Sequence, residues 1–204
     1  MFISFEGTEG VGKSTLIVKL HAFLQAQQRE VVLTREPGGT PLAERIRSLL
    51  LSTEQQEDIH YDTELLLMYA ARAQHLAQVI LPALQAGKIV LCDRFCDASY
   101  AYQCAGRGLS AEKLQLLNQH FVARLPDLTF WLDAPVDLGM QRATQRGALD
   151  RFEQEKLSFF SQVRHGYQQL QQQEPSRIKR IDATQSAEQV YAEALQHIQQ
   201  FDGF

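Results

Sequence analysis

The chain has 204 residues, of which 45% are hydrophobic and 22% are charged, and its formal net charge at pH 7 is −4. This length and composition predict a globular protein of one domain, or at most two small ones. The acidic balance argues against nonspecific nucleic-acid binding, which needs a basic surface. No apolar run approaches the roughly 20 residues of a membrane-spanning helix. We therefore expect neither nucleic acid nor a membrane as a partner.

The first predicted elements are a strand, a glycine loop and a helix in direct succession. An apolar run at residues 2–5 predicts a buried strand, and apolar residues at helical spacing follow Ser14. The residues between fit the pattern G-x-x-x-x-G-K-[ST], in which backbone N–H groups and a helix N-terminus surround a polyphosphate. Lys13 would reach the terminal phosphates and the Ser14 hydroxyl would contact Mg²⁺. The predicted ATP-binding residues here are Gly7, Thr8, Glu9, Gly10, Val11, Gly12, Lys13, Ser14 and Thr15.

Further apolar runs alternate with helical patterns along the rest of the chain. Those at residues 31–33, 89–92 and 128–132 are nearly continuous, and one at 178–181 is weaker. This alternation is typical of a parallel sheet covered by helices on both faces. We predict a single P-loop domain over residues 1–204, an α/β fold with a doubly wound, five-stranded parallel sheet that binds ligands beyond the carboxyl ends of its strands.

A long helical pattern at residues 64–86 contains Pro82, which is expected to kink or break the helix near its last turn. The apolar residues at 65–69 are more than one buried face requires. This surplus fits either a partner subunit or a deeper core position, and both interpretations stay open.

Charged residues directly follow the third strand. A carboxylate at such a strand end can serve Mg²⁺ or its water shell, so Asp93 joins Ser14 as a predicted metal ligand. The guanidinium group of an arginine suits bidentate binding of phosphate. Arg94 is therefore predicted to bind a second phosphate group.

The three cysteines are odd in number and include no C-x-x-C pair, unlike a disulfide framework or a zinc site. The six histidines show no H-E-x-x-H spacing. The first strand begins almost at Met1 and leaves no room for a secretory leader. We therefore expect a cytoplasmic protein.

Arginines cluster around a predicted turn late in the chain. Arg142 and Arg146 are four residues apart and lie on one face of a predicted helix. Gly147 suits the end of that helix, and Arg151 follows in a short loop. We interpret residues 142–153 as a lid that closes over phosphates and excludes water. A solvated helix end is the alternative.

Taken together, these motifs resemble those of bacterial thymidylate kinases over nearly the whole chain. The Thr-Arg-Glu-Pro-Gly-Gly-Thr segment and the Asp-Arg strand end, in that order after a phosphate loop, are the most specific. The segments that carry the resemblance are the glycine loop and residues 34–40, 69–72, 93–95, 101–108 and 146–151. The resemblance implies phosphorylation of dTMP to dTDP by ATP and Mg²⁺, in dTTP biosynthesis, by a homodimer.

The resemblance also implies which residues hold the phosphate and sugar of the acceptor. Arg94 and Arg47 match the positions that bind its phosphate, and Arg35 lies nearby. Tyr102 matches an aromatic residue placed where a ribose 2′-hydroxyl would clash. Glu9 matches an acidic residue near the 3′-hydroxyl.

Base recognition is implied in the same way. Arg72 matches the arginine that reads a thymine carbonyl, and Ser99 and Gln103 match positions around the ring N–H. Met68 stands where the family usually presents a Phe to stack on the base, and the neighbouring Tyr69 shares that role. The predicted substrate-binding set also contains Glu36 and Pro37.

The phosphate loop itself divides the family. Some members carry an arginine in this loop, at the position that is Gly10 here. The resemblance therefore implies that Arg146 and Arg151 of the lid supply the catalytic charge, together with Lys13 and Arg94, and that Arg142 lies nearer the ATP base.

Two other functions remain as alternatives. A GTP-binding switch is expected to have an N-K-x-D motif after a strand, and this sequence contains none. Another nucleoside monophosphate kinase is the second alternative, although Arg72, Ser99 and Gln103 favour a pyrimidine that has both a carbonyl and an N–H.

Overall fold

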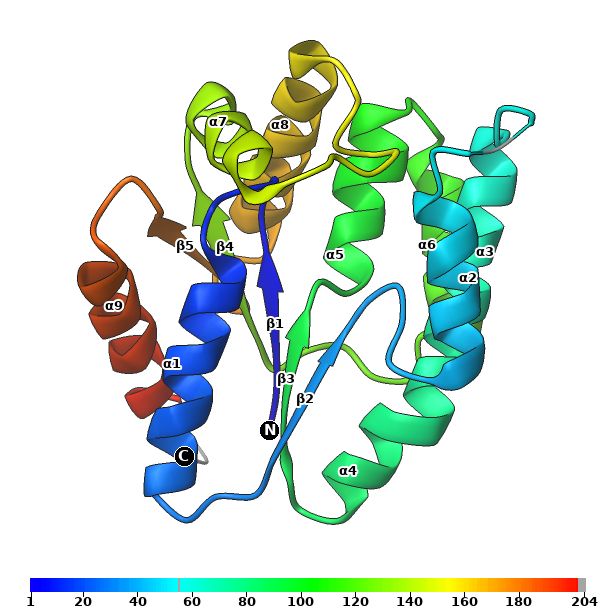
Figure 1. The fold of residues 1–204 in the computed structure, drawn as a ribbon. Helices are drawn as coiled ribbons and strands as arrows, with labels where there is room; N and C mark the ends of the chain where they lie inside the picture. Colours follow the sequence, from blue (N-terminus) through cyan, green and yellow to red (C-terminus); the bar gives the residue numbers. More distant parts are fainter. Residues whose placement is uncertain (55, 202–204) are drawn as a thin grey trace.

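A computed structural model describes residues 1–54 and 56–201. They contain a five-stranded parallel sheet in the order β2-β3-β1-β4-β5, with helices on both faces (Figure 1). The strands are β1 (Phe2–Glu6), β2 (Val31–Arg35), β3 (Ile89–Asp93), β4 (Leu128–Asp133) and β5 (Ile178–Asp182). Each strand begins where its apolar run was predicted and ends one or two residues later. The prediction of a doubly wound α/β fold is confirmed.

Helices link the strands and cover the sheet. They are α1 (Lys13–Ala26), α2 (Pro41–Leu51), α3 (Tyr61–His75), η1 (Leu76–Ile80), α4 (Leu81–Gln85), α5 (Cys96–Ser99), η2 (Tyr100–Gly106), α6 (Ala111–Phe121), α7 (Val136–Arg146), α8 (Leu157–Gln173) and α9 (Ala187–Gln199). Within the described ranges, none of them is long and apolar enough to cross a membrane.

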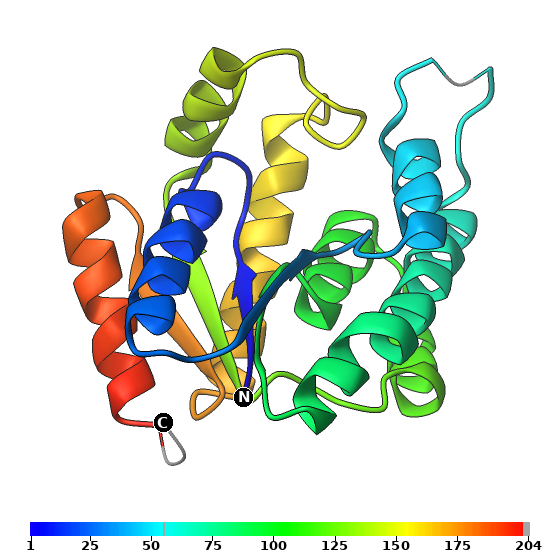
Figure 2. The ribbon, with the colours of Figure 1, turned by 60° about the horizontal axis from the view of Figure 1, so that its bottom comes forward.

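The core explains why the strands have nearly continuous apolar sequences. Ile3 and Phe5 of β1 pack against Leu20 of α1 and Ile198 of α9 on one face of the sheet. On the other face, α8 and the helix formed by α5 and η2 pack side by side (Figure 2). They bury aromatic side chains such as Phe160. Because both faces are covered, the strands cannot alternate between apolar and polar residues.

The helical pattern at residues 64–86 is continuous, but it is not a single α-helix. The α-helical turns of α3 give way to a π-helical segment, η1, before α4 begins. Pro82 lies in the first turn of α4. The predicted disruption near Pro82 therefore takes the form of a wider helical turn just before the proline, not of a chain reversal.

All five strands end at the same edge of the sheet, where the chain also places α7 and the loop that leads from it to α8. Figures 1 and 2 show this loop reaching across the top of the sheet toward α2. The backbone N–H of Arg151 in the loop donates to the carbonyl oxygen of Leu51 at 3.2 Å. The segment predicted as a lid thus bridges two sides of the ligand-binding edge.

Candidate active site

The glycine loop lies between β1 and α1, as predicted, and folds around the side chain of Lys13. The Lys13 ammonium donates to the carbonyl oxygens of Thr8 at 2.9 Å and Gly7 at 3.3 Å. Burial and the nearby Arg94 lower the pKa of Lys13. Residues 9–15 line a pocket beside the loop, which we call the P-loop pocket. The loop thus holds a buried cation and the N-terminus of α1 in one place, which suits a polyphosphate.

The packing of α7 explains why the loop has glycine at position 10. A Cβ atom at Gly10 would lie 2.0 Å from the carbonyl oxygen of Gly139 in α7. In turn, a Cβ atom at Gly139 would lie 2.4 Å from the carbonyl oxygen of Glu9. Real Cβ contacts are never this short, so neither position has room for a side chain. An arginine at position 10 would require α7 to lie farther from the loop.

The predicted metal ligands lie together in the P-loop pocket, and they fit Mg²⁺. Ser14 and Asp93 both line it, and Oδ1 of Asp93 is buried without a hydrogen bond from the described residues. In residues 1–54 and 56–201 no group of three or more His, Cys, Asp or Glu side chains could hold a metal by itself. Mg²⁺ usually takes only one or two protein oxygens and completes its shell with phosphate and water.

Four arginines converge on the P-loop pocket from different elements. Arg35, Arg47, Arg94 and Arg142 all line it. Burial and the charge of Arg35 lower the pKa of Arg47, whose Nη1 donates to the carbonyl oxygen of Pro37 at 3.0 Å. Arg94 donates to Oε1 of Glu9 at 2.6 Å. Such a gathering of cations is typical of an anion site.

The guanidinium of Arg94 is linked through Tyr167 to a buried acid, Glu6, which was not among the predicted site residues. Arg94 has a left-handed backbone with φ of 69°, and its Nη1 donates to the Tyr167 hydroxyl at 3.2 Å. Tyr167 donates to Oε2 of Glu6 at 2.7 Å, and Oε1 of Glu6 accepts the N–H of Phe95 at 2.7 Å. Burial, aided by the charge of Asp97, raises the pKa of Glu6 to about 8. The only sequence signal was an acid at the end of an apolar strand.

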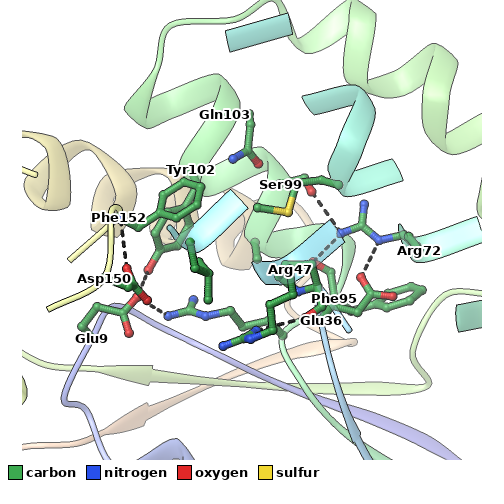
Figure 3. Close-up of a pocket in the computed structure, with 15 residues that line it drawn as sticks. Glu9, Glu36, Arg47, Arg72, Phe95, Ser99, Tyr102, Gln103, Asp150 and Phe152 are labelled. Atoms are coloured by element: carbon green, nitrogen blue, oxygen red, sulfur yellow. Dashed lines mark hydrogen bonds and ion pairs between the residues drawn. The ribbon is translucent and has the colours of Figure 1, made fainter. Parts of the chain in front are cut away.

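A second pocket, which we call the α3–η2 pocket, lies next to the first (Figure 3). Ala98 and Tyr102, and likewise Ser99 and Gln103, are four residues apart, so one helical turn places them on the same side. Among the predicted residues, the pocket brings together Glu9, Glu36, Pro37, Arg47, Met68, Arg72, Arg94, Ser99, Tyr102 and Gln103. Sequence reasoning missed the lining residues Leu51, Phe95, Ala98, Asp150 and Phe152.

Arg72 is fixed by a buried network and keeps one donor unused. Its Nε donates to Oε2 of Glu36 at 2.6 Å, and its Nη2 donates to the Ser99 hydroxyl at 3.0 Å (Figure 3). The other Glu36 oxygen lies 3.0 Å from Nδ1 of His75. Although burial opposes the charge, Glu36 raises the pKa of Arg72 above its ordinary value. Nη1 of Arg72 is buried without a partner among the described residues, as expected of a donor kept for a ligand.

Met68 and Tyr69 point in different directions. Met68 lines the α3–η2 pocket, whereas the described lining does not include Tyr69. The Tyr69 hydroxyl donates to Oδ1 of Asn118 in α6 at 2.7 Å, and the Tyr69 ring lies 4.7 Å from the guanidinium carbon of Arg72. Tyr69 therefore supports Arg72 from behind the pocket and does not face a bound base.

Tyr102 and Glu9 form the boundary between the two pockets. The Tyr102 hydroxyl donates to Oε1 of Glu9 at 2.8 Å, and both residues line the α3–η2 pocket (Figure 3). Burial raises the pKa of Tyr102, so its hydroxyl stays a donor. Its ring is held edge-on by Phe152 and Phe159.

Of the two lid arginines whose side chains are described, one lies at the P-loop pocket and the other does not. Arg142 lines this pocket and donates to the carbonyl oxygen of Ala183 at 3.3 Å. Arg151 instead donates to the carbonyl oxygen of Leu50 at 2.7 Å and to Oε2 of Glu64 at 2.6 Å. Arg146 ends α7, but its side chain lies outside the described residues. The catalytic roles of Arg146 and Arg151 therefore stay predictions.

A third pocket extends the P-loop pocket along α1. Arg142 lines both, together with residues 10–12 of the loop. Ala183 and Gln185, which follow β5, complete it and were missed by sequence reasoning because no phosphate-binding motif includes them. Among the residues that the structure describes, this third pocket shares no lining residue with the α3–η2 pocket.

Comparisons with known proteins agree over nearly the whole chain. A family model for thymidylate kinase matches residues 5–194. A thymidylate kinase of Acinetobacter baumannii (strain SDF) is 70% identical over 198 residues, which cover 97% of this chain and 100% of that protein. One from Psychrobacter sp. (strain PRwf-1) is 56% identical over 203 residues, covering 98% and 97%. The crystal structure of thymidylate kinase from Ehrlichia chaffeensis has a TM-score of 0.79 at 33% identity and covers 98% of both chains. The chain therefore belongs to the thymidylate kinase family.

Proposed function

We propose that this enzyme transfers the γ-phosphoryl group of ATP, bound in the P-loop pocket, to the phosphate of dTMP, bound in the α3–η2 pocket. One observation carries this proposal: the two pockets share a wall. Glu9, Glu36, Arg47, Arg94 and Asp150 line both of them. Two phosphate groups bound from opposite sides would meet at this wall, which also holds two arginines.

The donor half needs little rearrangement. A polyphosphate would replace the loop carbonyls that Lys13 now contacts, and the backbone N–H groups before α1 would bind its oxygens. Ser14 and the unpaired oxygen of Asp93 would hold Mg²⁺, whose charge would neutralise the phosphates. The adenine would lie beside Arg142 in the pocket formed with Ala183 and Gln185.

The acceptor half reads both ends of the nucleotide. Arg94 and Arg47 would bind the phosphate, with Arg35 at the outer rim of the P-loop pocket. The unused Nη1 of Arg72 would donate to a thymine carbonyl, and Gln103 would accept the ring N–H. The remaining residues proposed to contact the acceptor are Glu9, Glu36, Pro37, Met68, Ser99 and Tyr102.

The chemistry follows from position and charge. A phosphate monoester is mostly dianionic near neutral pH, so it attacks without a general base. The shared wall holds the two anions in line despite their repulsion, and the closed site excludes water. We assign the added positive charge on the transferring group to Arg146 and Arg151. For Arg151 this role requires the loop to exchange its contact with Glu64 for a phosphate.

We also propose a homodimer. Exposed apolar side chains lie on adjacent helices, with Leu66 on α3 and Leu116 and Phe121 on α6. Each of the three is at least half exposed, and a partner subunit would cover them. A cytoplasmic location stays a prediction as well, and it rests on three buried cysteines that are free thiols.

A coupled assay of ADP release tests the proposal. The enzyme is supplied with ATP, Mg²⁺ and one monophosphate at a time: dTMP, dUMP, dCMP, AMP or GMP. We expect dTMP to have the highest kcat/KM, and we expect activity to disappear when a chelator removes Mg²⁺. A purine monophosphate as the best acceptor would favour another nucleoside monophosphate kinase. Hydrolysis of GTP without an acceptor would favour a switch.

A further inference from the structure

Glu64 is a buried carboxylate that has no role of its own in the proposed phosphoryl transfer. It lies in α3 outside the lining of the α3–η2 pocket, and its side chain is 0% exposed. Its Oε1 accepts a hydrogen bond from Nε2 of Gln103 at 2.9 Å, and its Oε2 accepts one from Arg151 at 2.6 Å. Arg107 lies against both oxygens at 3.5 Å. Glu64 thus joins the base-reading side of the site to the lid.

The chemistry of Glu64 determines how the Gln103 amide is turned. A glutamine can present either its carbonyl oxygen or its NH₂ group to a ligand, because its two ends are almost the same shape. A carboxylate between two guanidinium groups can only accept hydrogen bonds, so it must face the NH₂ group. The Gln103 carbonyl oxygen is then the end left for the pocket. Within the described parts of the chain, no hydrogen bond reaches it.

The pocket therefore presents a donor and an acceptor in defined places. Nη1 of Arg72 is an unused donor and Oε1 of Gln103 is an unused acceptor. A base with a carbonyl beside a ring N–H, such as thymine or uracil, complements this pair. Cytosine has an amine and an unprotonated ring nitrogen at the same places, so it would oppose both groups.

We propose that Glu64 is a positioning residue that sets base specificity, because it holds the Gln103 carbonyl oxygen toward the acceptor base. The inference rests on the proposed reading of thymine by Gln103. Glu64 holds this oxygen in place without contacting the nucleotide. It retains this contact when Arg151 leaves for the phosphates, because Gln103 and Arg151 bind different oxygens.

The variant Glu64→Gln tests this directly. The new amide can donate as well as accept, so Gln103 is free to turn its NH₂ group toward the base. We expect the ratio of kcat/KM for dTMP to that for dCMP to fall by about 10–100-fold. Weaker contacts to Arg107 and Arg151 would slow both acceptors alike, so they would not change the ratio. The ratio of dTMP to dUMP should stay within about twofold, because both bases present the same groups to this pair.

Two controls separate positioning from a general structural effect. Glu155 forms an ion pair with Arg107, whereas the Gln103 amide donates to Glu64, so Glu155→Gln should leave the dTMP-to-dCMP ratio unchanged. Gln103→Ala should lower this ratio, and adding Glu64→Gln to it should lower the ratio no further. Thermal melting of each variant reports whether the fold is kept.

A second variant guards against loss of the fold. Glu64→Asp keeps the charge for the two arginines but withdraws the oxygens by one methylene group, so the dTMP-to-dCMP ratio should still fall. An unchanged ratio in folded Glu64→Gln and Glu64→Asp, with a lowered ratio in Gln103→Ala, would overturn the role of Glu64 and leave the proposed function standing. An unchanged ratio in Gln103→Ala would overturn the proposed base reading, and this inference with it.

Discussion

The two halves of the site differ in how completely they are assembled. On the base side, Arg72 is held by Glu36 and Ser99 and retains a single unused donor. On the lid side, Arg151 is bound to Glu64 and Leu50, away from the P-loop pocket. The base side is preorganised, whereas under the proposed mechanism the segment that holds Arg151 has to move before this charge reaches the phosphates. Under that proposal, base recognition is built into the fold and catalysis depends on closure.

The largest expected effect is on the lid. Arg151→Ala should lower kcat by about 10³-fold and change either KM by much less, because the proposed contact forms only in the transition state. Steady-state kinetics with both substrates varied would measure this. Arg151→Lys is the matched control, and it should recover part of the rate. An increase in KM at unchanged kcat would instead assign Arg151 to ground-state binding.

A substitution on the base side should change KM for dTMP and leave kcat nearly constant. Arg72→Lys keeps a charge beside Glu36 but loses the planar fork that also bonds Ser99. We expect KM for dTMP to rise by about 10–100-fold, while kcat and KM for ATP change little. Steady-state kinetics with both substrates varied would measure these constants. A fall in kcat at constant KM would mean that the two halves are not separate in function.

The contact between α7 and the phosphate loop offers a milder test. Gly139→Ala would place a Cβ atom 2.4 Å from the carbonyl oxygen of Glu9 and push α7 away from the loop. We expect stability to fall by about 1–3 kcal/mol, with a loss of activity toward all acceptors. Denaturant unfolding and the acceptor assay would measure both. Gln141→Ala, on the exposed side of α7, should leave both unchanged.

The last prediction concerns the dependence of stability on pH. Burial raises the pKa of Glu6 from 4.5 to about 8, so the native state holds this proton more tightly than the unfolded chain does. The resulting stabilisation is fully present below pH 4.5 and is lost as the pH rises through about 8. Glu6→Gln should flatten this part of the dependence of unfolding free energy on pH. The same slope in the variant and in the unchanged protein would show that Glu6 is not its source.

The kinase family and the strand positions were predictable because both depend on local sequence. Each buried strand is a short apolar run, and the phosphate loop is one continuous segment. Most of the residues expected to bind the acceptor were also brought together, since the carboxyl ends of parallel strands meet at one edge. The family comparison confirms the resemblance, whereas the roles of single residues stay predictions.

The direction in which a side chain points was harder to predict than which residues lie close together. Met68 and Tyr69 are neighbours on one helix, and only the placement of α3 shows that Met68 faces the pocket. Phe152 and Asp150 of the segment predicted as a lid line the same pocket, although only the arginines of that segment were predicted as site residues. These outcomes depend on how helices pack, and helix packing is decided by contacts between residues far apart in the chain.

The sequence by itself determined the phosphate loop, the order of strands and helices, and the family, because each is written in contiguous residues. Only the tertiary structure decided that α7 leaves no space for a side chain at Gly10, and that Glu64 joins Gln103 to Arg151. Both relations connect residues that lie far apart in the chain. The first arises from the close packing of α7 on the loop. The second arises from burial, which removes water as a partner and makes each polar group depend on the particular neighbour that the fold supplies.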